Sequence, residues 1–240
     1  MRLLTVLLLT TLASCGSTAG EPADDPDLRI LFIGNSLTQA NQLPDLVQHL
    51  GRSDPSRNVR VGVVANGGYS LEDHWNRGEA QRAIASQRWD LVVLQQGPSA
   101  LPESRELLID YATRFAAEIR KVGARPAIYM VWPELERESE WDNVTASHVA
   151  AAQAIGGLLL PGGEALRALR ASHPSLQLFS DGFHPTLAGS YEVALIIYGE
   201  ATGVSPIGLT LKAGGIGLPT ADVSALEAAA ADVIEQYAGE

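Results

Sequence analysis

The sequence predicts an α/β fold, with a parallel sheet of five strands and helices packed on both faces. Short, almost wholly apolar runs alternate along the chain with longer stretches in which apolar residues recur every three or four positions. Such alternation is typical of β-α-β units, which lay parallel strands side by side and cover the sheet with helices. The 240 residues, 46% of them hydrophobic, are enough for one domain with a sizeable core.

Residues 1–27 are predicted to lie outside this domain. Arg2 precedes a short leucine-rich run that ends in small residues, which is the pattern of an export signal. The run is too short to span a bilayer as a permanent helix. Leu12-Ala13-Ser14-Cys15 resembles the lipobox of bacterial lipoproteins. That resemblance implies a signal peptide over residues 1–14 and lipidation of Cys15.

Two interpretations of this leader stay open. In the first, Cys15 carries a membrane anchor in the cell envelope, and residues 15–27 form a flexible tether, since they contain no large apolar residue. In the second, an ordinary secretory signal is cleaved near Ala19 and the protein is secreted or periplasmic. Cys15 is the only cysteine, so no intramolecular disulfide can form. Both interpretations leave residues 28–240 as the folded domain.

Within this domain the first three strands follow from short apolar runs. Residues 28–33 and 91–94 are almost wholly apolar, as expected for strands buried on both faces, and residues 59–65 form a β-branched run. Between the first two strands, apolar residues at positions 43, 46, 47 and 50 mark one face of a helix. Ser70 is placed to cap another helix that starts near residue 72.

The second half of the chain repeats this alternation. The remaining strands are predicted over residues 127–132 and 176–179. Apolar periodicity or alanine richness predicts helices over residues 108–122, 141–160, 164–172, 187–198 and 223–237.

Net charge limits the partners of the protein. The chain has 28 acidic and 17 basic residues, a formal net charge of −11, so its overall field does not attract nucleic acid or anionic lipid. The histidines form no cluster with metal-ligand spacing, and no phosphate-binding glycine loop is present. We therefore expect no metal and no cofactor.

Residues able to do chemistry follow four of the five predicted strands. They are Ser36 after the first strand, Gly68 after the second, Gln95 and Gln96 after the third, and Asp181 and His184 after the fifth. Because ligands bind outside the carboxyl ends of parallel strands, we expect these residues to share one edge of the sheet.

Ser36, His184 and Asp181 form the minimum set for nucleophilic acyl transfer. A serine hydroxyl attacks well only when a neighbouring base takes its proton, and a carboxylate three residues before a histidine can orient that base. Gly34 is expected to permit the sharp turn that presents Ser36. Each motif alone also has an ordinary interpretation, as a strand-to-helix turn or a surface turn.

The two motifs together resemble a known family. Residues 32–38 (Phe-Ile-Gly-Asn-Ser-Leu-Thr) and 181–189 (Asp-Gly-Phe-His-Pro-Thr-Leu-Ala-Gly) are similar to the first and last signature blocks of the SGNH, or GDSL-like, hydrolases. The resemblance runs from about residue 28 to 199. It implies a flavodoxin-like three-layer α/β/α sandwich, with Ser36 as nucleophile, His184 as base and Asp181 as its partner.

The resemblance also implies an oxyanion hole. One donor is the Ser36 backbone; in the second block Gly68 is favoured and Ser70 comes next. The third block has Gln95 and Gln96 where most members have asparagine, and it resembles a bacterial lipoprotein subgroup with Leu-Gln-x-x-Ser. Neighbouring strand residues face opposite ways, so only one of the two glutamines can point inward, and which one depends on the phase of the strand. Gln96 is favoured, and Gln95 stays the alternative. In the remaining alternative, the third donor is missing.

The implied activity is hydrolysis of acetyl or other short-chain acyl esters, with polysaccharides or small esters as candidate substrates. A catalytically weak carbohydrate-binding protein and an acyltransferase on the same scaffold are the alternatives. His74, after the second block, could line a substrate groove or serve helix packing. The acyl length, the alcohol part of the substrate and the oligomeric state are not determined by the sequence.

Overall fold

The computed structural model describes residues 28–54 and 58–238. The expectations for the export signal, Cys15 and the tether fall on residues 1–27, outside the described residues. In the described part of the chain, no helix combines the length and the apolar character needed to cross a membrane.

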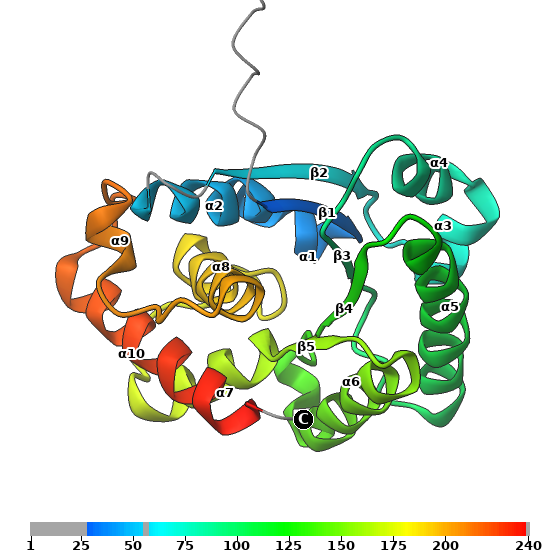
Figure 1. Cartoon of the computed structure of the whole chain (residues 1–240). Coiled ribbons are helices and arrows are strands. Elements are labelled where there is room, and N and C mark those ends of the chain that lie inside the picture. Colours follow the sequence, from blue (N-terminus) through cyan, green and yellow to red (C-terminus); the bar gives the residue numbers. More distant parts are fainter. Residues whose placement is uncertain (1–27, 55–57, 239–240) are drawn as a thin grey trace, which may run out of the picture.

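The centre of the domain is a five-stranded, all-parallel sheet, as predicted (Figure 1). Its strands are β1 (Leu28–Gly34), β2 (Val59–Ala65), β3 (Leu91–Leu94), β4 (Arg125–Tyr129) and β5 (Leu158–Leu160). Their order across the sheet is β2-β1-β3-β4-β5, the flavodoxin-like order. From β1 the chain first adds β2 on one side and then crosses over to add β3 on the other side. The switch point of the topology therefore lies between β1 and β3.

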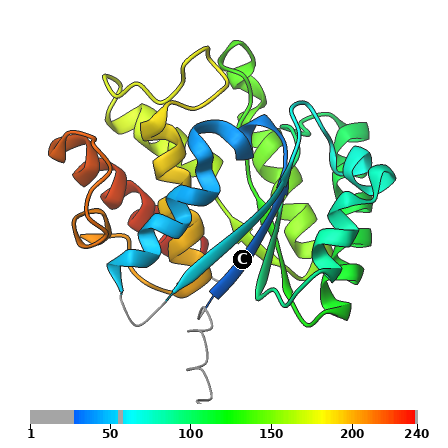
Figure 2. The ribbon, with the colours of Figure 1, turned by 90° about the horizontal axis from the view of Figure 1, so that it is seen from above.

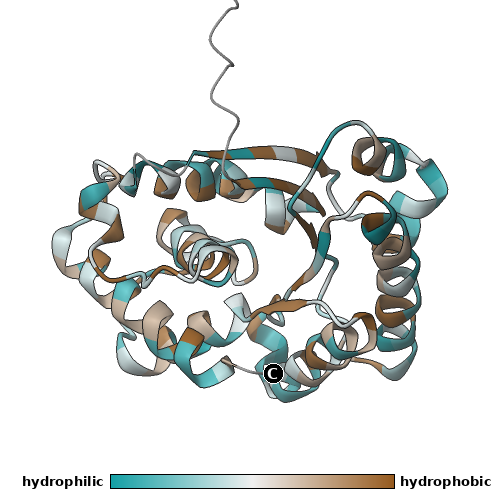
Figure 3. Cartoon of the chain, in the orientation of Figure 1, coloured by the Kyte–Doolittle hydropathy of each residue, from teal (hydrophilic) through white to brown (hydrophobic). Residues whose placement is uncertain are grey.

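Two layers of helices cover the sheet (Figures 1 and 2). One face carries α2 (Leu43–Leu50), α7 (Gly162–Ser172), α8 (Leu187–Thr202) and α10 (Thr220–Tyr237). The other carries α3 (Leu71–Arg77), α4 (Glu79–Ala85), α5 (Pro102–Lys121) and α6 (Trp141–Ile155). The shorter helices are α1 (Ser36–Gln39) and α9 (Leu209–Lys212), and 3₁₀ turns cover Ala40–Gln42, Gly51–Ser53 and Leu135–Glu140. Brown, apolar stretches of the strands lie between the layers in Figure 3. Strand β3 and most of β1 are buried, as expected for strands covered on both faces, whereas the edge strand β2 is largely half-buried.

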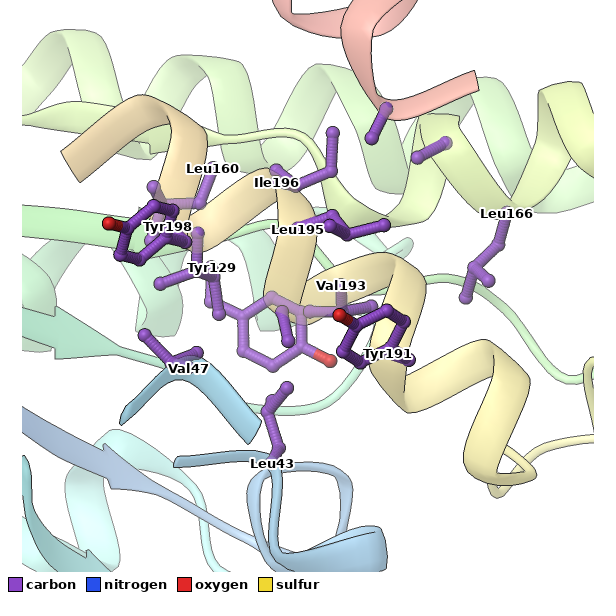
Figure 4. Close-up of a cluster of buried hydrophobic side chains, with 14 of the residues drawn as sticks. Leu43, Val47, Tyr129, Leu160, Leu166, Tyr191, Val193, Leu195, Ile196 and Tyr198 are labelled. Carbon is purple, nitrogen blue, oxygen red and sulfur yellow. The ribbon is translucent and has the colours of Figure 1, made fainter. Parts of the chain in front are cut away.

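Helix α8 is the central helix of its layer. Twelve consecutive residues, 188–199, are buried, so the helix has no solvent face over that length. In Figure 4 its side chains Tyr191, Val193 and Leu195 lie among those of Leu43 and Val47 from α2, Tyr129 from β4 and Leu166 from α7. Thr186 caps the helix by accepting a hydrogen bond from the Gly189 N–H at 3.3 Å, as the sequence predicts.

The predicted fifth strand is wrong. Residues 176–179 form no strand of the sheet, and Phe179 makes only an isolated antiparallel bridge with Pro185. The fifth strand is instead β5, whose residues fall within the helix predicted over 141–160. Gly156, with φ 51°, ends α6 before this strand. Three apolar residues are too few to show strand periodicity, so the pattern did not separate β5 from the helix.

Candidate active site

Ser36 is the first residue of α1, directly after β1. Asn35 caps this helix, and its side-chain oxygen accepts the Leu37 N–H at 3.1 Å. The N–H of the first helical residue has no partner inside a helix. Among the described residues the Ser36 N–H has no acceptor, so it is free to bind a substrate oxygen.

Gln95 holds this turn from behind. Its Oε1 accepts the Asn35 N–H and the Thr38 hydroxyl, both at 2.8 Å. Its Nε2 donates to Asn35 Oδ1 at 3.0 Å and to the Gln96 carbonyl at 2.8 Å. An amide group offers two hydrogens, and both are used here. Gln95 therefore has no spare donor for an oxyanion, and these contacts do not support the alternative that it supplies one.

Gly34 is required for a different reason from the one the sequence suggests. It is not among the residues with positive φ, so the turn does not depend on a conformation that only glycine adopts easily. A Cβ at this position would overlap the side chains of Thr38 and Gln95. The glycine therefore provides room for the hydrogen bonds that hold the turn.

The fold brings Ser36, His184 and Asp181 together, although 148 positions separate the serine from the histidine. His184 Nδ1 lies 2.8 Å from Asp181 Oδ2, and His184 Nε2 lies 3.0 Å from the Ser36 hydroxyl oxygen. A carboxylate can only accept, so Nδ1 carries the hydrogen, and in the neutral imidazole Nε2 accepts the hydroxyl hydrogen of Ser36. This is the hydrogen-bond pattern in which an imidazole can take the serine proton.

Asp181 is held in its ionised form. Its side chain accepts hydrogen bonds from the His184 imidazole and from the backbone N–H groups of His184 and Phe183, at 2.8, 2.7 and 3.0 Å. These hydrogen bonds lower the pKa of Asp181 to about 2. Because the pKa is lowered, Asp181 stays ionised at pH values at which an ordinary aspartate is already protonated. Its charge is lost only as the pH falls towards 2.

The site is open to solvent. The side chains of His184 and Asp181 are 41% and 56% exposed. Beside them lies a hollow of about 380 Å³, whose other wall is the segment after β4 that carries Glu134, Leu135 and Glu136. Ser36 is half-buried and does not line this hollow, which lies on the side of His184 and Asp181.

In the second block, the favoured donor Gly68 keeps its N–H free. This residue is exposed, has φ 75°, and its N–H has no acceptor among the described residues. Ser70 is committed elsewhere: both its N–H and its hydroxyl donate to Asp73 Oδ2, at 2.9 and 2.8 Å, in the capping box of α3. Its donors are therefore unavailable for an oxyanion, as long as the cap is intact. The Asn35 amide donates to the Tyr69 carbonyl at 3.1 Å and so ties this block to the nucleophile turn.

Gln96 directly follows Gln95 beyond the end of β3, and its side chain has a different set of partners. Its Oε1 accepts the Leu71 N–H at 3.0 Å, and its Nε2 donates to the Ser99 hydroxyl oxygen at 2.9 Å. The second amide hydrogen has no acceptor in the described structure. Of the two glutamines, only Gln96 retains a donor.

His74 serves packing beneath the nucleophile. It is buried, and its Nε2 donates to the Gly34 carbonyl at 2.8 Å. Burial lowers the pKa of this imidazole, so it stays neutral. Within the described part of the chain, no group of three or more acidic, histidine or cysteine side chains could hold a metal ion.

No family model matches the sequence, and no curated protein matches it either. Solved structures are similar. A protein from Slackia heliotrinireducens, assigned to the SGNH hydrolases, shares 30% identity over 72% of this chain and 98% of its own, with a TM-score of 0.62. A DUF4886 family protein from Bacteroides uniformis has 18% identity over 89% and 96% of the two chains and a TM-score of 0.72.

An acetylxylan esterase from Geobacillus stearothermophilus is also similar, with 18% identity over 74% of this chain and 95% of its own and a TM-score of 0.60. At such identities the last two structures show the shared fold alone. The extent and identity of the Slackia match go further, and the chain belongs to the SGNH hydrolases. The family resemblance of the two sequence motifs is thereby confirmed, whereas the lipoprotein subgroup stays a prediction.

Proposed function

We propose that the protein is a serine esterase that removes acetyl or other short-chain acyl groups from hydroxyl-rich substrates. The observation that carries the proposal is the continuous hydrogen-bonded line from Ser36 through His184 to Asp181, with distances of 3.0 and 2.8 Å. Membership of a family of hydrolases supports the same class of reaction.

In the proposed mechanism, Ser36 attacks the ester carbonyl while His184 takes its proton. Asp181 keeps the imidazole in the required tautomer and stabilises the imidazolium. The tetrahedral intermediate collapses, His184 protonates the departing alcohol, and the acyl group remains on Ser36. A water molecule then repeats the sequence and releases the acid. The free N–H groups of Ser36 and Gly68, with the spare amide hydrogen of Gln96, are the proposed oxyanion donors.

Two observations support a carbohydrate ester as substrate. The hollow beside His184 is open and carries carboxylates at positions 134, 136 and 181, which are good acceptors for sugar hydroxyls. One similar structure is that of an acetylxylan esterase. We therefore favour O-acetylated saccharides over long-chain lipid esters.

The experiment is hydrolysis of p-nitrophenyl acetate and of O-acetylated xylose oligomers by wild type and by Ser36→Ala. We expect the substitution to reduce the rate by about 10⁴ to 10⁶, the loss seen for triad members elsewhere. Asp45→Asn, at an exposed position of α2, is a matched control for a change at a polar side chain. A folded Ser36→Ala protein that keeps most of the activity would refute the mechanism. Added glycerol that diverts acetyl from water would indicate acyl transfer.

We also propose that the protein is exported and anchored through Cys15. The support is the pattern of residues 1–15. In a bacterial host, wild type is expected in the membrane fraction with incorporated labelled fatty acid, and Cys15→Ala is expected without label. Soluble, unlabelled wild type that starts after residue 15 would favour the ordinary secretory signal instead.

A further inference from the structure

His184 stands on a segment without regular secondary structure, yet the segment is firmly tied to its surroundings. Four successive carbonyl groups, at positions 182 to 185, each accept a hydrogen bond. The donors are the Leu135 N–H to Gly182, the Trp132 indole to Phe183, the Ser180 N–H and hydroxyl to His184, and the Asn41 side chain to Pro185. The position of the imidazole is thus set by these anchors and not by a strand or helix.

Among these anchors only Asn41 belongs to the segment that carries Ser36. Its Nδ2 donates to the Pro185 carbonyl at 2.9 Å and to the Ser190 hydroxyl oxygen at 2.9 Å. Ser190 in turn donates to the Ala40 carbonyl at 3.3 Å. One amide hydrogen of Asn41 therefore joins the segment of Ser36 to the segment of His184, and the other joins it to α8, which follows that segment.

The backbone at this position is unusual. Asn41 and Gln42 have φ of 50° and 56°, so two consecutive residues with side chains adopt the left-handed conformation. This conformation is uncommon outside glycine, although asparagine tolerates it better than most residues. It is retained where the Asn41 side chain bonds the Pro185 carbonyl, and strained conformations of this kind cluster at functional sites.

We propose that Asn41 is a positioning residue that sets the distance between the Ser36 hydroxyl and His184 Nε2. The inference rests on the proposed function, because it assigns Asn41 to the same site. The histidine side chain is 41% exposed, so little packing holds it from the solvent side. An error of about 1 Å in the placement of reacting groups can cost about 10² in rate.

Two variants separate the side-chain bond from the backbone conformation. Asn41→Gly accepts the left-handed backbone easily and removes the donor. Asn41→Asp keeps the size of the side chain and replaces the donating amide by an oxygen opposite the Pro185 carbonyl. Gln42→Gly is the matched control, since Gln42 shares the backbone conformation and its side chain makes no hydrogen bond in the described structure.

For both Asn41 variants we expect kcat with p-nitrophenyl acetate to fall by about 10 to 10², with KM little changed. Asn41→Gly should unfold at the wild-type temperature or above, and Gln42→Gly should keep wild-type kcat. A wild-type kcat in both Asn41 variants overturns the proposal. A loss of activity that disappears when the assay is run far below the unfolding temperature overturns it too, because Asn41 would then serve stability alone.

A second measurement needs no substrate. The ring nitrogen signals of ¹⁵N-labelled His184 report whether Nε2 accepts the Ser36 hydroxyl, with Ser36→Ala as the reference for the broken bond. Asn41→Gly is expected to move the Nε2 signal towards that reference, and an unchanged signal contradicts the proposal. If wild type hydrolyses no ester, the proposed function fails, but this measurement still tests the role of Asn41.

Discussion

At the scale of single residues, two adjacent glutamines after β3 differ in the partners that their side chains bind. Gln95 and Gln96 have the same chemistry, but Gln95 uses both amide hydrogens to hold the nucleophile turn, and Gln96 keeps one hydrogen without a partner. Hydrogen-bonding capacity therefore distinguishes a supporting residue from a candidate oxyanion donor.

We expect Gln96→Ala to lower kcat by about 10² to 10³ with little change in KM, because an oxyanion donor binds the transition state more strongly than the ground state. Gln95→Ala should lower the free energy of unfolding by about 1 to 3 kcal/mol, since it leaves buried partners unsatisfied. Steady-state kinetics and urea unfolding of both variants measure these effects.

If neither variant lowers kcat by more than about tenfold, the glutamines contribute no donor and the N–H groups of Ser36 and Gly68 act alone. A Gln95→Ala protein with wild-type stability would show that the hydrogen bonds of Gln95 are not needed to hold the nucleophile turn.

At the scale of elements, the junction of β1 and α1 depends on close packing. The side chains of Thr38 and Gln95 occupy the space in which a Cβ of residue 34 would lie. Gly34→Ala should therefore displace the turn and cost about 1 to 3 kcal/mol of unfolding free energy, together with most of the activity.

Thermal unfolding of Gly34→Ala tests this expectation. Gly67→Ala is the stability control, because a Cβ at position 67 meets nothing within 4 Å and its φ is not positive. Equal unfolding temperatures for the two variants would show that the junction can relax and that Gly34 is not needed for space.

At the scale of the whole molecule, the buried carboxyl group of Glu192 opposes folding at neutral pH. Glu192 lies in α8 with no solvent exposure, and neither side-chain oxygen has a partner among the described residues. Burial raises the pKa of Glu192 well above its ordinary range. The folded protein must therefore keep a proton on this group when the unfolded chain has already released it.

We expect Glu192→Gln to stabilise the protein increasingly as the pH rises above about 4.5. The wild type loses up to about 1.4 kcal/mol per pH unit from this group until its raised folded pKa is reached. Denaturant unfolding at several values between pH 5 and pH 8 measures the difference. Glu106→Gln, at an exposed position of α5, controls for the loss of one charge. A stability difference that is constant with pH would show that Glu192 is not a buried protonated acid.

Much of the fold follows from local patterns, and the exceptions have clear causes. Strands β1, β2 and β3, the Ser70 cap and the long helices lie where apolar periodicity predicts them, because each pattern is contained within a few turns or one strand. Strand β5 was missed because three residues carry too little pattern, and its pairing with β4 decides its structure.

The sequence by itself determined the class of fold, the family and the residue types of the candidate site, because short motifs record local backbone and chemical requirements. The tertiary structure alone decided that Ser36 meets His184, that Gln95 is used up in supporting the turn, and that Asn41 joins the two segments. The physical reason is that each of these facts is a hydrogen bond between segments far apart in the chain. Such a bond exists only after the domain has folded and brought the segments of Ser36 and His184 together.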